Sequence, residues 1–458
     1  MASTLATLHA GILTPEQAKT VANGIQSNLQ WAAERPASER PTDYLDIQGL
    51  LYLKTGSDGS RMHSGRSRQD MLATLHRLLL RDRLLRVSAD LIALRTHFLA
   101  QAARHPDAIV PSYTNGVQAQ PVLLAHQLLG YESALARSSR RLIEVHRRLN
   151  RSPLGAAALA TSRFALDRPL LARLLGFDAP VDNTFDAAQL AVVDTGVECA
   201  QTATLPALQL GMFAQDLQAQ FHHARPWILL GDPDLSSPST LMPQKRNPVA
   251  LNRIRLLGSQ IIGASATAVL AAHNVASGMT DYKRADASHA LDLCILLLDQ
   301  ASSVVRSLRV DPDAALEQLQ AEYTTTSELA ASLQERVNLP LSVAHEFASQ
   351  LVKHARAQRA SLRELPFSDV TELYDQTLLE ARQADHSHFD PSSLPPQGQT
   401  FPFPEAEFLE IIHPRTMVDS YKGTGGSSPQ EVERMQGEAS AAASRDQEEL
   451  SAIQLAQS

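Results

Sequence analysis

The sequence has little cysteine, no sustained basic run and no long apolar run, and each shortage excludes a class of protein. Its 458 residues include two cysteines, Cys199 and Cys294, which lie far apart in apolar stretches. They fit neither a disulfide framework nor a metal-binding spacing, so we expect a reducing, cytoplasmic location and neither a metal nor another cofactor.

Charge and hydropathy exclude two further kinds of partner. The formal net charge is -8 and the pI is near 6.1, which argues against nucleic acid as the main partner. No run approaches the roughly 18 apolar residues of a membrane span, and the N-terminus lacks a basic region followed by an apolar core. We therefore expect a soluble protein that binds no membrane and no nucleic acid.

Strand signals are nearly absent, whereas helical spacing of apolar residues recurs along most of the chain. Thr14, Pro15 and Gln17 indicate a helix start, and the helix should reach about residue 34. Long helices are predicted at 70–103, 122–149, 186–223, 254–274 and 287–308. Residues 35–68 should be irregular, and the tail beyond about residue 436 should be a frayed helix or disordered. The fold class that follows is all-α.

The most informative stretch is 236–255, which reads SSPSTLMPQKRNPVALNRIR. Prolines fill its first half, and helical spacing begins only after Asn247, so a loop should lead into a helix. The loop offers two hydroxyls (Ser239 and Thr240), a cation (Lys245) and an amide (Asn247), next to helix N–H groups that favour anions. Such groups suit carboxylate binding, although a polar surface loop is an equally good explanation on composition alone.

A second candidate segment is 62–70, MHSGRSRQD. Two arginines and several polar side chains around Gly65 form a plausible carboxylate clamp, because guanidinium binds carboxylate bidentately. A solvated helix cap explains the same residues equally well.

Several of these segments resemble one enzyme superfamily. Residues 239–248 resemble the G-S-S-x-M-P-x-K-x-N-P loop of argininosuccinate lyase, fumarase and aspartase, with Pro238 in place of Gly and Thr240 in place of the second Ser. Residues 63–70 resemble the H-T-G-R-S-R-N-D motif of argininosuccinate lyase. Further resemblances lie at 113–121 (Y-T-H-L-Q-R-A-Q-P), 152–160, 182–187, 279–286 and 413–427.

The resemblance implies an architecture. It predicts a bundle of long central helices flanked by smaller helical regions, divided as 1–110, 111–355 (with the signature loop at 236–248) and 356–458. It also implies a homotetramer in which each active site is built from three subunits.

The resemblance implies a reaction as well, namely anti β-elimination of a C–N or C–O bond from a substituted succinate, with release of fumarate. Ser239 would be the base, and Lys245 and Asn247 would hold the carboxylate while negative charge develops on it. The implied substrate-binding residues are Ser64, Arg68, Gln69, Thr114, Asn115, Gln120, Thr240 and Met242. The ligand would be a small carboxylate.

Two departures from the family pattern redirect this prediction. Asn115 and Asn252 occupy the positions where the lyases pair a His with a Glu, and amides cannot carry a proton near neutral pH. We therefore predict a specialised carbon–nitrogen lyase rather than ordinary argininosuccinate cleavage. A non-catalytic or regulatory tetrameric paralogue, and an enzyme that runs addition or cyclisation, remain as alternatives.

Overall fold

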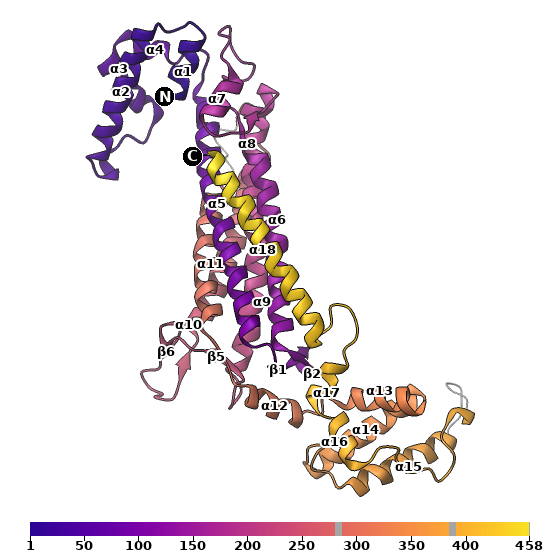
Figure 1. Cartoon of the computed structure of the whole chain (residues 1–458). Coiled ribbons are helices and arrows are strands. Elements are labelled where there is room, and N and C mark those ends of the chain that lie inside the picture. Colours follow the sequence, from indigo (N-terminus) through magenta and orange to yellow (C-terminus); the bar gives the residue numbers. More distant parts are fainter. Residues whose placement is uncertain (280–285, 384–390, 458) are drawn as a thin grey trace.

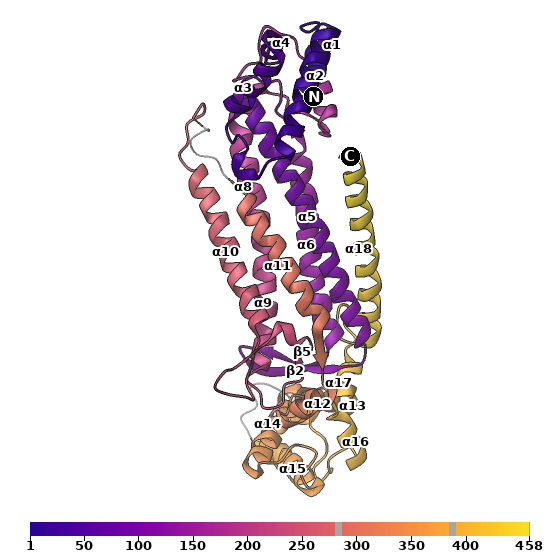
Figure 2. The same cartoon turned by 90° about the vertical axis from the view of Figure 1, so that its left-hand side faces the viewer.

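Long helices form a central bundle, and a smaller helical unit lies at each end of it (Figures 1 and 2). The computed structural model describes residues 1–279, 286–383 and 391–457. The bundle helices are α5 (Arg68–Arg104), α6 (Leu124–Leu149), α8 (Ala191–Thr202), α9 (Thr204–Gln220), α10 (Val249–Ala272), α11 (Ser288–Ser307) and α18 (Pro429–Gln457). The all-α prediction is confirmed.

The remaining elements form the two end units and the connections. At the N-terminal end lie α1 (Ala2–His9), α2 (Pro15–Ala33), η1 (Ala37–Glu39), α3 (Tyr44–Thr55), α4 (Ser57–Arg61) and α7 (Arg168–Leu174). At the other end lie α12 (Pro312–Ala321), α13 (Thr326–Val337), α14 (Leu341–Gln358), α15 (Phe367–Gln383), η5 (Pro391–Ser393), α16 (Glu405–Ile411) and α17 (Pro414–Ser420). A π-helical turn, η2 (Asp186–Leu190), precedes α8, and a short helix, η3 (Pro233–Leu235), follows α9.

The described strands are short and pair in twos. They are β1 (Ile109–Thr114) with β2 (Val117–Leu123), β3 (Arg151–Ser152) with β4 (Ala179–Pro180), β5 (Ile228–Leu230) with β8 (Leu308–Val310), and β6 (Ser237–Pro238) with β7 (Arg246–Asn247). All of these pairs are antiparallel except β3 with β4.

Helix α5 is the axis of the bundle, and its start is fixed by side chains. Ser67 and Asp70 form a capping box, in which each side chain accepts a hydrogen bond from a backbone N–H near the other residue. Asp70 also accepts from the N–H groups of Gly155 and Ala157, at 2.9 and 3.0 Å. With 37 residues, α5 is about 55 Å long, so it separates the two ends of the bundle by that distance.

The region expected to be irregular, 35–68, in fact holds two helices, so that expectation was wrong. Asp43 caps α3 by accepting a hydrogen bond from Leu45 N at 2.7 Å. Gly56, with φ of 57°, ends α3 and starts α4. Gly56 therefore separates two helices rather than marking a long loop.

The helix expected to run from residue 186 to about 223 is interrupted. It begins with the π-helical turn η2, and α8 and α9 are then separated at Ala203. Pro206, in the first turn of α9, explains this second break, since proline has no N–H and its ring clashes with the carbonyl four residues earlier.

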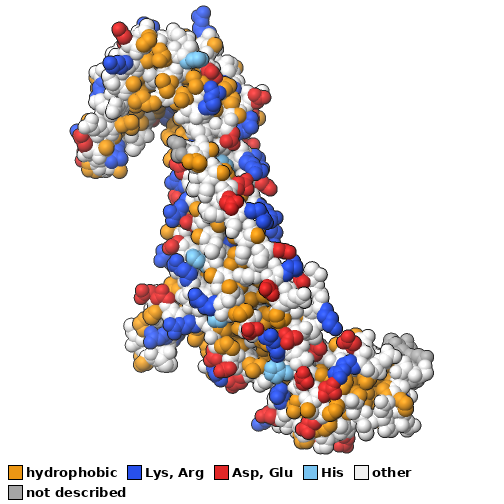
Figure 3. Space-filling model, viewed as in Figure 1, with side chains coloured by type: hydrophobic (Ala, Val, Ile, Leu, Met, Phe, Trp, Pro, Cys, Tyr) orange, Lys and Arg blue, Asp and Glu red, His pale blue; other side chains and the backbone are white. Residues whose placement is uncertain are grey.

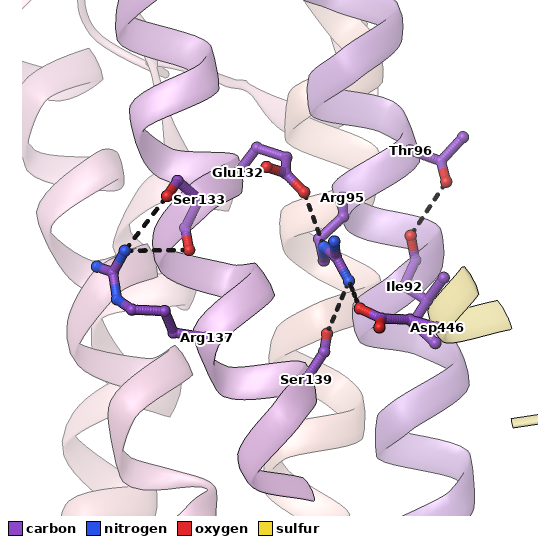
Figure 4. A network of polar contacts seen from close by, with 8 residues as sticks. All are labelled: Ile92, Arg95, Thr96, Glu132, Ser133, Arg137, Ser139 and Asp446. Atoms are coloured by element: carbon purple, nitrogen blue, oxygen red, sulfur yellow. Dashed lines mark hydrogen bonds and ion pairs between the residues drawn. The ribbon is translucent and has the colours of Figure 1, made fainter. Parts of the chain in front are cut away.

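The tail beyond residue 436 is neither frayed nor disordered, because α18 continues through Gln457 and packs on α5 and α6 (Figure 2). A buried network holds it there (Figure 4). Arg95, whose side chain is 0% exposed, donates to Glu132 at 2.8 Å and to Ser139 at 3.3 Å, and it also pairs with Asp446 of α18. Burial raises the pKa of the Glu132 carboxyl, even though Arg95 opposes that shift.

Two hydrophobic cores correspond to the bundle and to the C-terminal unit. One connects α5, α6, α9, α10 and α11 and includes residues of α18, and the other spans 329–412. Helix α5 belongs to the predicted N-terminal segment 1–110 and α18 to the predicted C-terminal segment 356–458, yet both helices lie in the bundle. The predicted boundaries between segments, at residues 110 and 355, stay a prediction.

Two of the described helices, α10 and α11, are long and apolar enough by composition to cross a membrane. Core helices of soluble proteins pass the same test. Half of the apolar window of α11 is buried inside the bundle, whereas only 33% of the window of α10 is buried. Helix α10 therefore leaves a largely uncharged face open.

Candidate active site

The signature loop is a small β-hairpin rather than an open loop. Ser237 pairs with Asn247 and Pro238 with Arg246, and Ser239 N donates to Lys245 O at 3.3 Å. The Asn247 side chain closes the base of the hairpin, because its Nδ2 donates to Ser237 O at 3.2 Å. Helix α10 begins directly afterwards, as the apolar spacing predicted.

Ser239 lies where the hairpin turns, and backbone N–H groups point at its hydroxyl. Met242 N donates to Ser239 Oγ at 3.1 Å, and Leu241 N makes a longer contact at 3.4 Å. Donors of this kind stabilise a negatively charged oxygen and thus favour the alkoxide form of a serine. The sequence had indicated N–H groups at the start of the following helix as donors to an anion, but the N–H groups that reach Ser239 come from the turn itself. A local serine turn is the purely structural reading of the same bonds.

The other polar groups of the hairpin face solvent. Lys245 makes no ion pair with any described residue, and Thr240 and Met242 are exposed. Figure 3 shows basic side chains on the protrusion at the lower left, where Figure 1 places this hairpin. The hairpin therefore carries a cation that pairs with no carboxylate of the described residues, and its turn holds a hydroxyl that receives N–H bonds.

The β1–β2 hairpin lies at the same end of the bundle (Figures 1 and 2). Thr114 pairs with Val117, so Asn115 and Gly116 form a two-residue turn with φ of 51° and 78°. Positive φ at both positions is the type I′ turn that Asn-Gly favours. Thr114, Asn115 and Gln120 are all exposed on this hairpin.

Asn252 is the second of the two asparagines that replace the family's His and Glu, and it lies in the first turn of α10. Its Oδ1 accepts a hydrogen bond from Gln218 Nε2 on α9 at 3.2 Å. Sequence reasoning missed Gln218 and its further partner Arg255, because nothing in the pattern of α9 distinguishes this glutamine from its neighbours.

Ser64, Arg68 and Gln69 lie at the opposite end of α5. Arg68 forms an exposed ion pair with Asp43 at 3.3 Å, and Gln69 Nε2 donates to Ala188 O at 2.9 Å. Helix capping accounts for Ser67 and Asp70, as described above, while Arg68 remains exposed at the bundle end.

One chain therefore does not bring all the predicted site residues together. The two hairpins lie at one end of the bundle and the Ser64–Gln69 segment at the other, about 55 Å away along α5. A site that uses all three segments must be built from more than one copy of the chain.

A surface cavity of about 220 Å³ lies between η2, α8 and the end of α10. Its lining includes Gln189, Asp194 and Ser277, and burial raises the pKa of the Asp194 carboxyl. Gly278 N donates to Gln189 Oε1 at 2.7 Å beside it. The segment 279–286, one of those that resemble the superfamily, lies almost entirely outside the described residues.

Comparison with known proteins agrees with this architecture. A family model described as "Lyase" matches residues 39–263. Argininosuccinate lyase from Mycobacterium sp. (strain JLS) is 32% identical over 414 residues, which cover 88% of this chain and 86% of that protein.

Solved structures agree as well. The crystal structure of EDDS lyase in complex with formate matches with a TM-score of 0.89 and 26% identity, covering 100% of this chain and 87% of that one. An EDDS lyase variant with bound fumarate matches with the same TM-score and coverage at 25% identity. The bundle and its signature hairpin thus define a lyase of the fumarase/aspartase superfamily.

Within that superfamily, the chain belongs to the argininosuccinate lyase family. It is a carbon–nitrogen lyase of argininosuccinate lyase type. The predictions of family and enzyme class are confirmed.

Proposed function

We propose that this lyase removes an amine from an amine-substituted succinate by anti β-elimination and releases fumarate. The observation that carries the proposal is the Ser239 hydroxyl, which receives N–H bonds from its own turn in a hairpin that also holds Lys245. The bound fumarate in a structure of the related EDDS lyase supports the same product.

The chemistry requires a base and a stabiliser of developing charge. Ser239, as alkoxide, takes the proton from the carbon next to a carboxylate, and the electron pair moves onto that carboxylate. Lys245 and Asn247 hold the resulting doubly charged group. The electron pair then returns to form the double bond while the C–N bond breaks, and the departing amine takes a proton from water.

Ordinary argininosuccinate is not the proposed substrate. Asn115 and Asn252 carry no proton that can be transferred near neutral pH, so they provide no acid for the leaving amine. The substrate should therefore have a leaving group that needs little acid assistance, or one that is protonated from solvent.

We further propose a homotetramer with shared active sites. Support comes from the separation of the three site segments along α5 and from the open face of α10, where Leu256 is 57% exposed and Leu270 71% exposed. Apolar side chains on a face without charge are suited to packing against a second copy. The two buried free thiols, Cys199 and Cys294, fit a cytoplasmic location.

The test is to follow fumarate absorbance with the purified protein, using fumarate with a panel of amines and, separately, argininosuccinate. Ser239→Ala should lower kcat/KM by about 10²- to 10⁴-fold, the usual contribution of a general base. Ser133→Ala, an exposed serine of α6, is the matched control and should leave the rate unchanged.

Two results would contradict the proposal. Full activity of Ser239→Ala would remove the serine from the mechanism. Absence of turnover with every amine and with argininosuccinate would favour the alternative of a tetrameric paralogue without catalysis. Gel filtration tests the assembly, since an active monomer is incompatible with a shared site.

A further inference from the structure

The surface cavity between η2, α8 and the end of α10 combines an aliphatic wall with a few polar groups. Most of its lining is aliphatic and consists of Leu190, Val193, Ala272 and Val275. The other lining residues are Gln189, Asp194 and Ser277, so none of the described residues that line the cavity is basic. Its volume of about 220 Å³ corresponds to about seven water molecules at about 30 Å³ each, which is room for a small organic molecule.

The three polar side chains differ in how far their hydrogen-bonding capacity is already used. Gln189 is 4% exposed, its Nε2 donates to Ala158 O at 3.3 Å, and its Oε1 accepts from Gly278 N at 2.7 Å, so it is a fixed part of the wall. Asp194 forms no ion pair, and Ser277 no side-chain hydrogen bond, with any residue that the structure describes. The cavity thus offers a carboxylate and a hydroxyl to a ligand.

The charge around the Asp194 carboxylate favours a cation. Arg77, the arginine that acts on this carboxylate, is engaged elsewhere, because it donates to three backbone carbonyls. No lysine or arginine occurs between residues 174 and 224 of the sequence. Burial raises the pKa of the Asp194 carboxyl, and the negative charges of Asp186 and Glu198 add to that shift. A cation in the cavity would relieve this excess of negative charge.

The lining also decides what kind of cation fits. A divalent metal ion needs several ligands, and the part of the chain that the structure describes holds no group of three His, Cys, Asp or Glu side chains that could bind one. An aliphatic wall instead favours an alkyl group, which leaves water on binding. An ammonium group has three N–H donors and no acceptor, so it complements a carboxylate and a hydroxyl oxygen.

We infer that this cavity is a binding site for a small primary alkylammonium ion of about four to six non-hydrogen atoms. Its ammonium group donates to the Asp194 carboxylate and to Ser277 Oγ, and its alkyl chain packs against Leu190 and Val193. The inference goes beyond the proposed function, because binding at this cavity requires no reaction.

The experiment is a ligand-observed NMR titration of the purified full-length protein with butylamine near neutral pH, where this amine is a cation. The dissociation constant should be about 1–10 mM, as the small number of ligand atoms implies. Two molecules of similar length serve as comparisons, namely neutral 1-butanol and anionic butyrate. Both should bind at least about ten-fold more weakly, because neither can form the charge-assisted hydrogen bond to Asp194.

Two substitutions separate the charge of the cavity from its shape. Asp194→Asn should raise the dissociation constant of butylamine at least about ten-fold. Glu198→Gln is the matched control, since it removes the same charge one turn further along α8 from a residue outside the lining, and it should change the constant less than about three-fold. Val193→Phe should abolish binding without a change of charge, because the larger ring occupies the cavity.

Four results would overturn the inference. They are no saturable binding of butylamine, equal affinity for butylamine and 1-butanol, an equal loss in Asp194→Asn and Glu198→Gln, and unchanged binding by Val193→Phe. Failure of the proposed function looks different, since it would appear as absence of turnover in the fumarate assay and would leave the NMR titration unaltered.

Discussion

Two arginines at different places in the bundle show two different effects of a polar network. Arg95 is fully buried and bound by the carboxylates of Glu132 and Asp446, which belong to two other helices. Arg255 is exposed and binds a neutral amide, Gln218, which in turn holds Asn252. The first network joins helices that are far apart in the sequence, whereas the second sets the orientation of one side chain near the candidate site.

The difference follows from solvent access. A buried charge that loses its partner is left in a medium of low dielectric constant, so its pairs cannot be broken at low cost. An exposed group that loses its partner is hydrated by water, and little stability is lost. We therefore expect substitutions in the buried network to lower the free energy of unfolding, and substitutions in the exposed chain to leave the free energy of unfolding nearly unchanged.

The largest effect should come from Glu132→Met, which leaves Arg95 buried with a single carboxylate. The free energy of unfolding should fall by about 3–5 kcal/mol in chemical denaturation, as for other broken buried pairs. Arg147→Met is the matched control, because Arg147 also links α6 to α18 through Glu449 but its side chain is 66% exposed. The control should lose no more than about 1 kcal/mol, and a similar loss in both variants would contradict the contrast.

The next effect concerns the backbone of the exposed turn between β1 and β2. Gly116→Ala places a Cβ at φ of 78° with no neighbour within 4 Å, so only backbone strain opposes it. We expect a loss of about 1–2 kcal/mol in the free energy of unfolding. Gly49→Ala, in helix α3 and equally free of neighbours, should instead stabilise by about 0.5–1 kcal/mol.

A smaller effect should appear as a pH dependence at the buried contact of α18 with α6. His146 is 4% exposed, and its Nε2 lies 2.8 Å from Gln457 Nε2, which requires an unprotonated acceptor nitrogen on the imidazole. Burial lowers the pKa of His146 below its usual 6.5, so the unfolded state takes up a proton first as the pH falls.

The stability that neutral His146 contributes should thus be complete above pH 6.5 and decline below it. Relative to His146→Gln, the wild type should lose about 1 kcal/mol of unfolding free energy between pH 7.5 and pH 5.5. Substitution of the exposed His222 by glutamine serves as the control. A constant difference between wild type and His146→Gln over this range would exclude the effect.

The smallest effect on stability should come from Arg255→Met, which opens the exposed chain. The free energy of unfolding in chemical denaturation should change by less than about 1 kcal/mol. Loss of stability on the scale of Glu132→Met would mean that the two networks do not differ as described.

Local signals made much of the fold predictable. The capping box of Thr14 and Gln17 placed the start of α2, and the apolar spacing after Asn247 placed the start of α10. The grouping of a hydroxyl, an ammonium and an amide in the signature loop could also be anticipated, because these residues are close in the sequence. The pairing of β6 with β7 in this loop could not be anticipated, since each strand has only two residues.

Other features were signalled but read differently. Asn115-Gly116 strongly favours a two-residue hairpin turn. Asn115 was instead interpreted only as the position where the lyases have a histidine. Pro206 marks the break between α8 and α9 within an otherwise continuous apolar pattern. Contacts such as Arg95 with Asp446, and Gln218 with Asn252, join elements whose approach depends on tertiary packing, which periodicity does not reveal.

The docking of α18 also has a consequence for the order of events during synthesis. Asp446 lies 351 residues after Arg95, so the buried guanidinium lacks this partner until translation has passed through α18. At about 5–20 residues per second, that interval lasts roughly 20–70 s. During this time the groove between α5 and α6 is uncovered in the nascent chain. Slower synthesis in this window should therefore prolong the time for which this apolar and charged surface is exposed before α18 covers it.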